Sequence, residues 1–198
     1  MIPPTYPARP INGGPFPLAP VKSGNSPWLY EPKYNDWRAI VHVPTGQMWE
    51  RHGKPLSIGS MFEQAVAELQ AISDSVCKIQ WLDCLALGRR HPLWRGTLVV
   101  LDLIDEAAKP YQVRRELMAD LFDAPDTLVP SRTPPPVLIP PRITGSAQMW
   151  EELQEINRLI GCEFYEGMVA KRADSRYPLQ RRSPDIEFPF WMKHRWAF

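Results

Sequence analysis

Residues 31–38 of the chain read Glu31-Pro32-Lys33-Tyr34-Asn35-Asp36-Trp37-Arg38, directly after the apolar residues 28–30. One lysine therefore stands between two acidic residues and an arginine. A lysine amine is a nucleophile only when it is neutral, and its ordinary pKa of about 10.4 leaves almost none neutral at pH 7. Burial or neighbouring cations lower that pKa. Lys33 is thus either a reactive amine in a cationic cleft or a solvated residue at a strand end.

Five further segments combine charged residues with apolar runs. They are, in order, Glu50-Arg51-His52-Gly53-Lys54, residues 81–87, residues 97–104, Glu166-Gly167-Met168-Val169-Ala170-Lys171-Arg172 and Trp191-Met192-Lys193-His194-Arg195. With the Lys33 run, they resemble the ordered motifs of the covalent nucleotidyltransferases, which include ATP-dependent DNA ligases, RNA ligases and mRNA capping enzymes. The specific matches are to K-x-D-G-x-R, E-G-x-V-x-K-R and W-x-K-x-K, and the resemblance extends from about residue 15 to the end of the chain.

The resemblance implies a role for each candidate residue. Lys33 would attack the α-phosphate of ATP, release pyrophosphate and retain AMP. Three residues would be catalytic: Lys33, Lys171 and Lys193. Six would bind ATP: Glu31, Lys33, Arg38, Lys171, Lys193 and Arg195. Arg51 would contact a terminal 5′-phosphate of the nucleic acid, and Glu166 would bind Mg²⁺ or Mn²⁺.

Strand geometry adds to these roles. Glu31 and Lys33 are two residues apart, so they share one face of an extended strand, as do Lys193 and Arg195. A carboxylate at position 31 can accept the exocyclic amine of adenine, and the resemblance to E-x-K-x-D-G-x-R favours ATP over GTP. Lys171 follows Glu166 by five residues and would lie on the opposite face of an ideal strand, so we expect a bend between them, at the glycine that follows Glu166.

Four positions depart from the family pattern. Asn35 stands where the family has Asp, and Asp36 stands where it has Gly. Leu85 replaces the Glu of the D-G-E strand, with Asp83 two positions away, and Leu101 replaces an aromatic residue. These departures keep open a second interpretation, a catalytically weak or inactive module that binds nucleic acid or nucleotide.

The composition excludes several classes of protein. The net charge is +1, so a nucleic-acid surface has to be a local patch. Candidate patches are Arg89-Arg90-His91, Arg114-Arg115 and Arg181-Arg182, with solvated arginines as the alternative. Three cysteines without a C-x-x-C pair predict free buried thiols in a reducing compartment, hence a cytoplasmic protein. The histidines lack zinc-site spacing, and no apolar run predicts a membrane span.

The apolar periodicity predicts an α+β fold with mainly antiparallel sheets. We expect a Pro-rich irregular arm over residues 1–27 and a nucleotidyltransferase (adenylation) domain over residues 28–198. The resemblance implies two sheets flanked by helices around a nucleotide cleft. Strands are expected at 28–32, 37–43, 47–51, 78–87, 97–104, 165–171 and 190–195, and helices at 60–73, 111–122 and 146–160. The 23 prolines cluster in residues 3–32 and 125–141. The second cluster should be an extended connector, with docking to a partner protein as the alternative.

The predicted function is an ATP-dependent polynucleotide ligase. It would pass AMP from Lys33 to a 5′-phosphate and join it to a 3′-hydroxyl, as in DNA repair, with nicked DNA favoured over RNA. The alternatives are the inactive binding module, an RNA ligase and a capping-type guanylyltransferase, which Glu31 disfavours. The sequence stops at Phe198, soon after the last motif, so we expect an adenylation domain without the OB-fold domain of most ligases.

Overall fold

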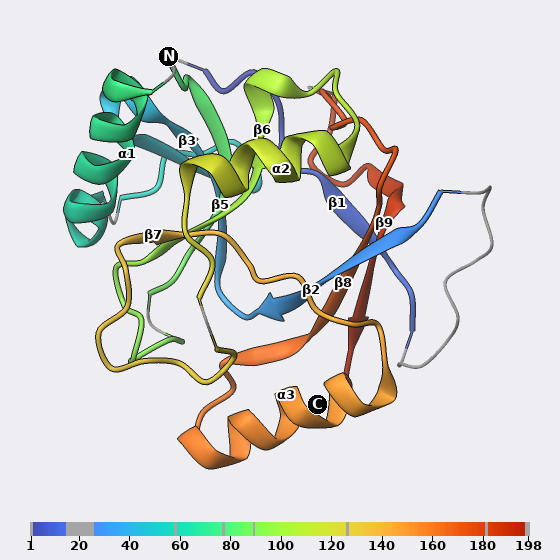
Figure 1. Ribbon diagram of the computed structural model, residues 1–198. Helices are drawn as coiled ribbons and strands as arrows, with labels where there is room; N and C mark the ends of the chain where they lie inside the picture. The colour runs from blue at the N-terminus through green and yellow to red at the C-terminus, as the bar shows by residue number, and fades with distance from the viewer. Residues whose placement is uncertain are drawn as a thin grey trace.

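Two β-sheets and three α-helices make up the part of the protein that the computed structural model describes, residues 2–14, 26–57, 59–76, 78–88, 90–125, 127–180 and 182–196 (Figure 1). Sheet A has the order β1-β9-β8-β2, with bounds Arg9–Asn12, Glu187–Arg195, Tyr165–Arg172 and Trp28–Tyr34. Sheet B has the order β4-β3-β5-β6-β7, with bounds Gln47–Glu50, Trp37–His42, Trp81–Ala86, Leu98–Leu103 and Val137–Leu138. The helices are α1 (Glu63–Ser75), α2 (Tyr111–Leu121) and α3 (Ala147–Ile160), and three short 3₁₀ helices span Val43–Thr45, Gly59–Phe62 and Ile104–Glu106.

The α+β prediction is confirmed. The strand pairs are antiparallel except β1 with β9 and β6 with β7. The boundaries agree to within a few residues, with α1 beginning three residues later than expected because a 3₁₀ turn precedes it. No helix among the described residues is both long and apolar enough to cross a membrane.

Strands β5 and β6 are buried on both faces, because sheet B lies between two apolar clusters. Along β5 the side chains alternate: Leu82 and Cys84 enter one cluster and Leu85 enters the other. The first cluster also takes in residues of α1 and α2, and the second takes in Leu153 and Ile156 of α3. Figure 1 shows α2 beside β6 and α3 beside β8, which is where these helices make their contacts. Burial on both faces explains the nearly continuous apolar sequence of β5 and β6.

Helix α3 carries clear start and stop signals. The Ser146 side chain accepts a hydrogen bond from the Met149 backbone N–H (3.1 Å), and Gly161 ends the helix in a left-handed conformation (φ 67°). A serine N-cap and a glycine C-cap are the residues that satisfy free helix-end groups most readily. The range predicted from apolar periodicity, residues 146–160, agrees with the observed helix to within one residue.

Helix α2 turns a partly polar face toward the interior. Val113 is exposed, and the helix turns Tyr111, Arg114, Arg115 and Met118 inward. Arg114 and Arg115 are therefore not surface phosphate contacts, as one candidate patch required. Apolar periodicity missed this face because two of its four residues are arginines that find acidic or carbonyl partners inside the protein.

The N-terminal segment is not wholly irregular. Residues 9–12 form β1, which pairs in parallel with β9, and the Tyr6 N–H donates to the Gln180 carbonyl (3.0 Å). An irregular arm was therefore the wrong prediction for residues 9–12. Residues 15–25 lie outside the described part, so the division of the chain at residue 27 stays a prediction.

The second proline cluster runs along the edge of sheet B. Leu98 N–H donates to the Pro136 carbonyl (2.9 Å), the Thr97 hydroxyl donates to the Pro135 carbonyl (3.1 Å), and residues 137–140 are buried. These contacts give the segment the predicted connector role. Docking to a partner protein stays a prediction, since residues 131–136 are exposed or half-buried.

The cysteine prediction is partly matched. Cys84 is a free, buried thiol whose pKa is raised by burial, and Cys162 is free and half-buried. Cys77 lies outside the described residues, as do Arg89 and Arg181 of the candidate patches.

A buried ion pair joins α2 to sheet B. Arg114 donates from Nε to Asp102 Oδ1 (2.6 Å) and from Nη2 to Oδ2 (2.8 Å), and both side chains are fully buried. Its third nitrogen donates to the Lys109 and Ser175 carbonyls. Burial raises the pKa of Asp102 although Arg114 opposes the shift. The pair therefore stabilises the fold only while both partners are present.

We predict that Arg114→Met lowers the free energy of unfolding by about 3–5 kcal/mol, because it leaves the Asp102 carboxylate buried and unpaired. Urea denaturation measures the loss. The matched control is Arg158→Met, which breaks an exposed pair with Glu155 and should cost at most about 1 kcal/mol. Equal losses in the two variants would contradict the assignment, and Asp102→Leu combined with Arg114→Met should recover part of the stability.

Candidate active site

A cavity of about 740 Å³ lies where the two sheets face each other. Its lining includes every residue that the sequence analysis assigned to the site: Glu31, Lys33, Arg38, Arg51, Glu166, Lys171, Lys193 and Arg195. Leu85 and Leu101, two of the departures from the family pattern, also line it. Residues up to 164 positions apart in sequence are thus brought to one site.

Strand register explains how sheet A contributes most of these residues. Across β2, β8 and β9, Lys33 is opposite Gly167 and Gly167 is opposite Arg195. The neighbouring row runs from Glu31 through Val169 to Lys193. Residues directly opposite one another in a sheet project from the same face, so each row directs its charged side chains toward the cavity.

Glu166 reaches the cavity through a β-bulge. Lys33 pairs with Gly167 but Tyr34 pairs with Tyr165, so Glu166 is an extra residue in β8. Gly167 has a φ of 143°, which suits glycine. A bulge re-aims a side chain next to it. The bend that the sequence analysis expected between Glu166 and Lys171 is therefore present.

Lys33 is an interior amine held by a carboxylate and surrounded by cations. Its Nζ pairs with Glu166 Oε1, and the same oxygen lies 3.3 Å from Arg195 Nη2. Burial, followed by the charges of Arg195, Arg38 and Lys193, lowers the pKa of Lys33 well below that of a free lysine. These are the two causes that produce a nucleophilic lysine at moderate pH.

Glu31 and Lys171 are partners of each other. Lys171 Nζ lies 2.9 Å from Glu31 Oε2, donates to the Leu101 carbonyl (2.9 Å), and sits 4.5 Å from the ring centres of both Tyr111 and Trp191. The Tyr111 hydroxyl donates to Glu31 Oε1. Tyr111 was missed by the sequence analysis, because its position on an ordinary amphipathic helix carries no motif.

Arg38 is held by the one acid of the β5 segment. Its guanidinium forms a fork on Asp83, with Nε 2.5 Å from Oδ1, and the Tyr177 hydroxyl donates to Asp83 Oδ2 (2.6 Å). Asp83 is fully buried. The acid that the sequence analysis noted two positions from Leu85 therefore orients an arginine of the cavity.

Two further cations line the cavity beside Lys193. Arg51 is exposed and its Nε donates to His52 Nε2 (2.8 Å). Arg9 of β1 pairs with Asp185 (2.8 Å) and was not singled out from the sequence. Burial and then the charges of Arg195 and Arg9 lower the pKa of Lys193. The cavity is thus rich in groups that attract anions.

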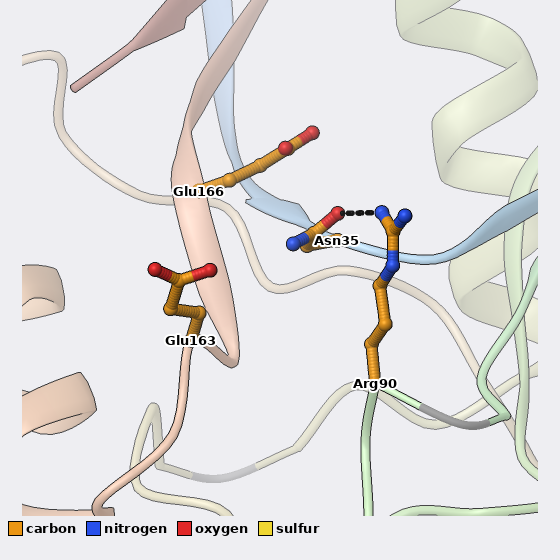
Figure 2. A pocket seen from close by; sticks show the side chains of 4 residues that line it. All are labelled: Asn35, Arg90, Glu163 and Glu166. Carbon is orange, nitrogen blue, oxygen red and sulfur yellow. Dashed lines mark hydrogen bonds between the residues drawn. The ribbon is translucent and has the colours of Figure 1, made fainter. Parts of the chain in front are cut away.

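The two departures after Lys33 have structural partners. Asp36 accepts hydrogen bonds from the Gly88 N–H (2.6 Å) and the Trp37 N–H (3.0 Å), and the described non-glycine residues all have negative φ. The Asn35 side-chain oxygen accepts from Arg90 Nη1 (2.7 Å). Figure 2 shows this contact in a second cavity of about 510 Å³, lined by Asn35, Arg90, Glu163 and Glu166.

The donors for a divalent metal are few. No three His, Cys, Asp or Glu side chains cluster as a metal site among the described residues. Mg²⁺, however, is commonly bound through one or two carboxylates together with substrate phosphates and water. Glu166, which lines both cavities, fits that mode of binding.

The comparisons with known proteins bear on the fold. No protein-family model and no curated protein sequence matches the chain. Among solved structures, the ligase domain of Mycobacterium tuberculosis LigD has a TM-score of 0.65 at 19% identity, covering 96% of this chain and 59% of that domain. A mycobacterial DNA ligase D complexed with ATP and MES has a TM-score of 0.61 at 19% identity, with 96% and 60% covered. The Chlorella virus DNA ligase–adenylate has a TM-score of 0.55 at 17% identity, with 96% and 69% covered.

These structures show that the chain has the fold of a DNA ligase nucleotidyltransferase domain, as the resemblance implied. The chain spans about 60% of the length of the two mycobacterial ligase structures.

The lowered pKa of Lys33 leads to a titration prediction. After reductive methylation with ¹³C-formaldehyde, the NMR signal of Lys33 should titrate well below pH 10.5, because burial and three cations disfavour its charged form. Arg195→Ala should move that midpoint upward, since it removes the largest contribution from a neighbouring charge. Lys33→Ala identifies the signal. A midpoint at the ordinary value in the wild-type protein would contradict the geometry.

The lowered pKa of Lys33 also determines the direction in which stability changes with pH. Between the folded-state pKa and 10.5 the unfolded chain holds more protons on Lys33 than the folded protein does, so this residue makes stability rise with pH in that window.

The β-bulge makes a second prediction. A Cβ at Gly167 would lie 1.9 Å from the His194 carbonyl oxygen, at a φ that L residues rarely adopt. We expect Gly167→Ala to lower the free energy of unfolding by about 1–3 kcal/mol or more. Gly161 has a positive φ but open space around it, so Gly161→Ala measures the cost of backbone strain alone. Gly59→Ala should cause neither backbone strain nor a clash. Thermal denaturation measures all three, and a Gly167→Ala loss no greater than that of Gly161→Ala would argue against the clash.

Proposed function

We propose that this protein is an ATP-dependent polynucleotide ligase, with DNA as the favoured substrate. The observation that carries the proposal is Lys33, an interior amine with a lowered pKa, beside Glu166 and among Arg195, Arg38 and Lys193. A neutral amine in a cavity lined by cations suits attack on a phosphate of high negative charge.

The first step transfers AMP to the enzyme. The Lys33 amine attacks the α-phosphorus of ATP, a nitrogen–phosphorus bond forms, and the bond to the bridging oxygen breaks with pyrophosphate taking the electron pair. The amine loses its proton to water. Lys193 and Arg195 offset the charge that develops on the phosphoryl oxygens.

Two further transfers complete the reaction. A 5′-phosphate oxygen of the nucleic acid displaces Lys33 from the AMP phosphorus, which regenerates the amine. The 3′-hydroxyl then attacks the 5′-phosphorus, a phosphodiester forms, and AMP leaves. Arg51, exposed at the cavity, is suited to hold the 5′-phosphate through its fork of N–H donors.

A divalent metal and the adenine base would use the remaining groups. Glu166 would hold Mg²⁺ or Mn²⁺, which supplies charge neutralisation at the phosphates. Glu31 would accept the adenine amine while Lys171 and Tyr111 hold its carboxylate in place. Lys171 thus acts on the nucleotide through Glu31 as well as through its own charge.

The solved neighbours favour DNA and ATP. Two are described as DNA ligases and one as the ligase domain of LigD; one of the DNA ligases is complexed with ATP and the other is a ligase–adenylate. One further neighbour, a Lig E DNA ligase described as binding DNA with a minimal scaffold, has a TM-score of 0.53 at 11% identity.

A second candidate function is a catalytically silent module that binds nucleic acid or nucleotide. It is favoured by the side chains of Asn35 and Asp36, which are engaged by Arg90 and Gly88. In that case the cavity would bind phosphate but Lys33 would form no covalent bond.

We predict that wild-type protein incubated with ATP labelled at the α-phosphate and Mg²⁺ or Mn²⁺ retains label after denaturation, and that Lys33→Ala retains none, because the bond to AMP forms on that amine. The control variant is Lys109→Ala, an exposed lysine outside the cavity, which should label like the wild type. The protein is first treated with pyrophosphate to remove any AMP already bound.

The outcomes separate the candidate functions. Label from ATP and not from GTP supports the ligase over a guanylyltransferase, and sealing of nicked DNA compared with nicked RNA assigns the substrate. Absence of label in folded, pyrophosphate-treated protein with both metals would reject the ligase and leave the binding module.

A further inference from the structure

Three hydrogen bonds join the turn after Lys33 to residues that follow β5. The Gly88 N–H donates to Asp36 Oδ2 (2.6 Å), Arg90 Nη1 donates to Asn35 Oδ1 (2.7 Å), and His91 Nε2 donates to the Asn35 carbonyl (3.1 Å). The two departures that follow Lys33, Asn35 and Asp36, are therefore used to hold Arg90 and its neighbours beside the cavity.

The residues that follow Arg90 are anchored in the interior. His91 is buried, with its ring 4.7 Å from that of Phe164. Trp94 is buried and its Nε1 donates to the Ser131 carbonyl (3.0 Å). Arg90 itself is exposed. Its side chain thus extends from a backbone that is held by its neighbours, which reduces the entropy lost when it binds a ligand.

The guanidinium of Arg90 stands between the two cavities. Arg90, Asn35 and Glu166 line both of them. In Figure 2 Arg90 and Glu163 lie on opposite sides of Asn35, and the Glu166 carboxylate is drawn above Asn35. No carboxylate among the described residues lies within 4.0 Å of the Arg90 guanidinium, although Glu163 and Glu166 share its cavity.

The side chain that holds Arg90, the Asn35 amide, carries no charge. An arginine has five N–H donors and always carries its charge. The Asn35 amide oxygen holds one of these donors without neutralising the guanidinium. A carboxylate at the same position would pair with it and cancel its charge. Arg90 therefore keeps an uncompensated positive charge and free donors, the combination that binds phosphate in a forked arrangement.

We propose that Arg90 is a phosphate-binding residue of this site, held in position by Asn35. The proposal rests on the proposed function, since it names a phosphate group of that reaction. The ligand chemistry is a phosphate with at least two free oxygens, which is either the 5′-phosphate of a nucleic acid or the terminal phosphates of ATP. Asn35 and Asp36 are then the residues whose hydrogen bonds position Arg90 in the site.

The test measures equilibrium binding without catalysis. A fluorescent nicked duplex with either a 5′-phosphate or a 5′-hydroxyl at the nick is titrated with protein in the presence of a chelator and without ATP. In a second arm, a fluorescent ATP analogue is titrated with the same proteins. The variants are Arg90→Ala, Arg90→Lys and Asn35→Asp, with Arg95→Ala as the matched control, since Arg95 is exposed and lines neither cavity.

We expect Arg90→Ala to weaken the binding of one of the two ligands by about tenfold to 100-fold, the range for a lost hydrogen bond to a charged group. Loss confined to the 5′-phosphorylated nick assigns the nucleic-acid phosphate, and loss confined to the ATP analogue assigns the nucleotide phosphates. Asn35→Asp should weaken binding of the same ligand while leaving Arg90 in place. The affinity of Arg90→Lys should lie between those of the wild type and Arg90→Ala, because lysine keeps the charge but not the fork of donors.

Two results would overturn the proposal: changes below twofold in both arms for Arg90→Ala, or an equal effect of Arg95→Ala. Circular dichroism confirms that each exposed-residue variant is folded. Because these assays need no lysine–AMP, they separate the two proposals. Phosphate binding that depends on Arg90 in a protein that never labels would reject the ligase alone, and labelling with Arg90-independent binding would reject the role of Arg90 alone.

Discussion

The β-bulge at Glu166 is the constraint on which the arrangement of the cavity depends. In a regular strand, Glu166 would lie on the face opposite to Val169 and Lys171. The bulge brings Glu166 onto the same face as these two residues. The bulge requires Gly167, because the His194 carbonyl of β9 occupies the space of any Cβ there. It brings one carboxylate onto Lys33 and Arg195 together, and so balances part of a strongly cationic site.

Around this point the protein distributes its buried charge in pairs that join different elements. Asp83 binds Arg38 between β5 and β3, and Asp102 binds Arg114 between β6 and α2. Glu31 binds Lys171 between β2 and β8. An unpaired charge in such surroundings is costly. The pairs therefore constrain how the sheets and α2 pack, and they leave Lys33 and Arg195 to share a single acid.

Three of the four departures from the nucleotidyltransferase pattern have identified neighbours in the structure. Asp36 caps the Gly88 amide, Asn35 holds Arg90, and Leu85 lies opposite Arg38 in the register of β3 and β5. Asp36 has no positive φ, so the turn does not need the glycine of the family pattern. Two of these positions serve one structural purpose, the placement of residues that follow β5 beside Lys33.

The sequence was sufficient for the fold class and for most of the helices and strands, because these depend on local periodicity and on end signals such as Ser146 and Gly161, and its short motifs named eight residues that line the cavity. It failed where a residue's role depends on a distant partner. The inward face of α2 carries Arg114 and Arg115, whose partners lie on β6, on β2 and in the loop before α3. β1 forms only because β9 offers it an edge. Tyr111 belongs to the site through a contact 80 residues away, and the Asn35 partner of Arg90, a candidate phosphate contact from the sequence, is 55 residues away. A linear pattern records residue types and spacings, whereas burial, pKa and pairing are set by what packs against each side chain, and that is established only when the chain is folded.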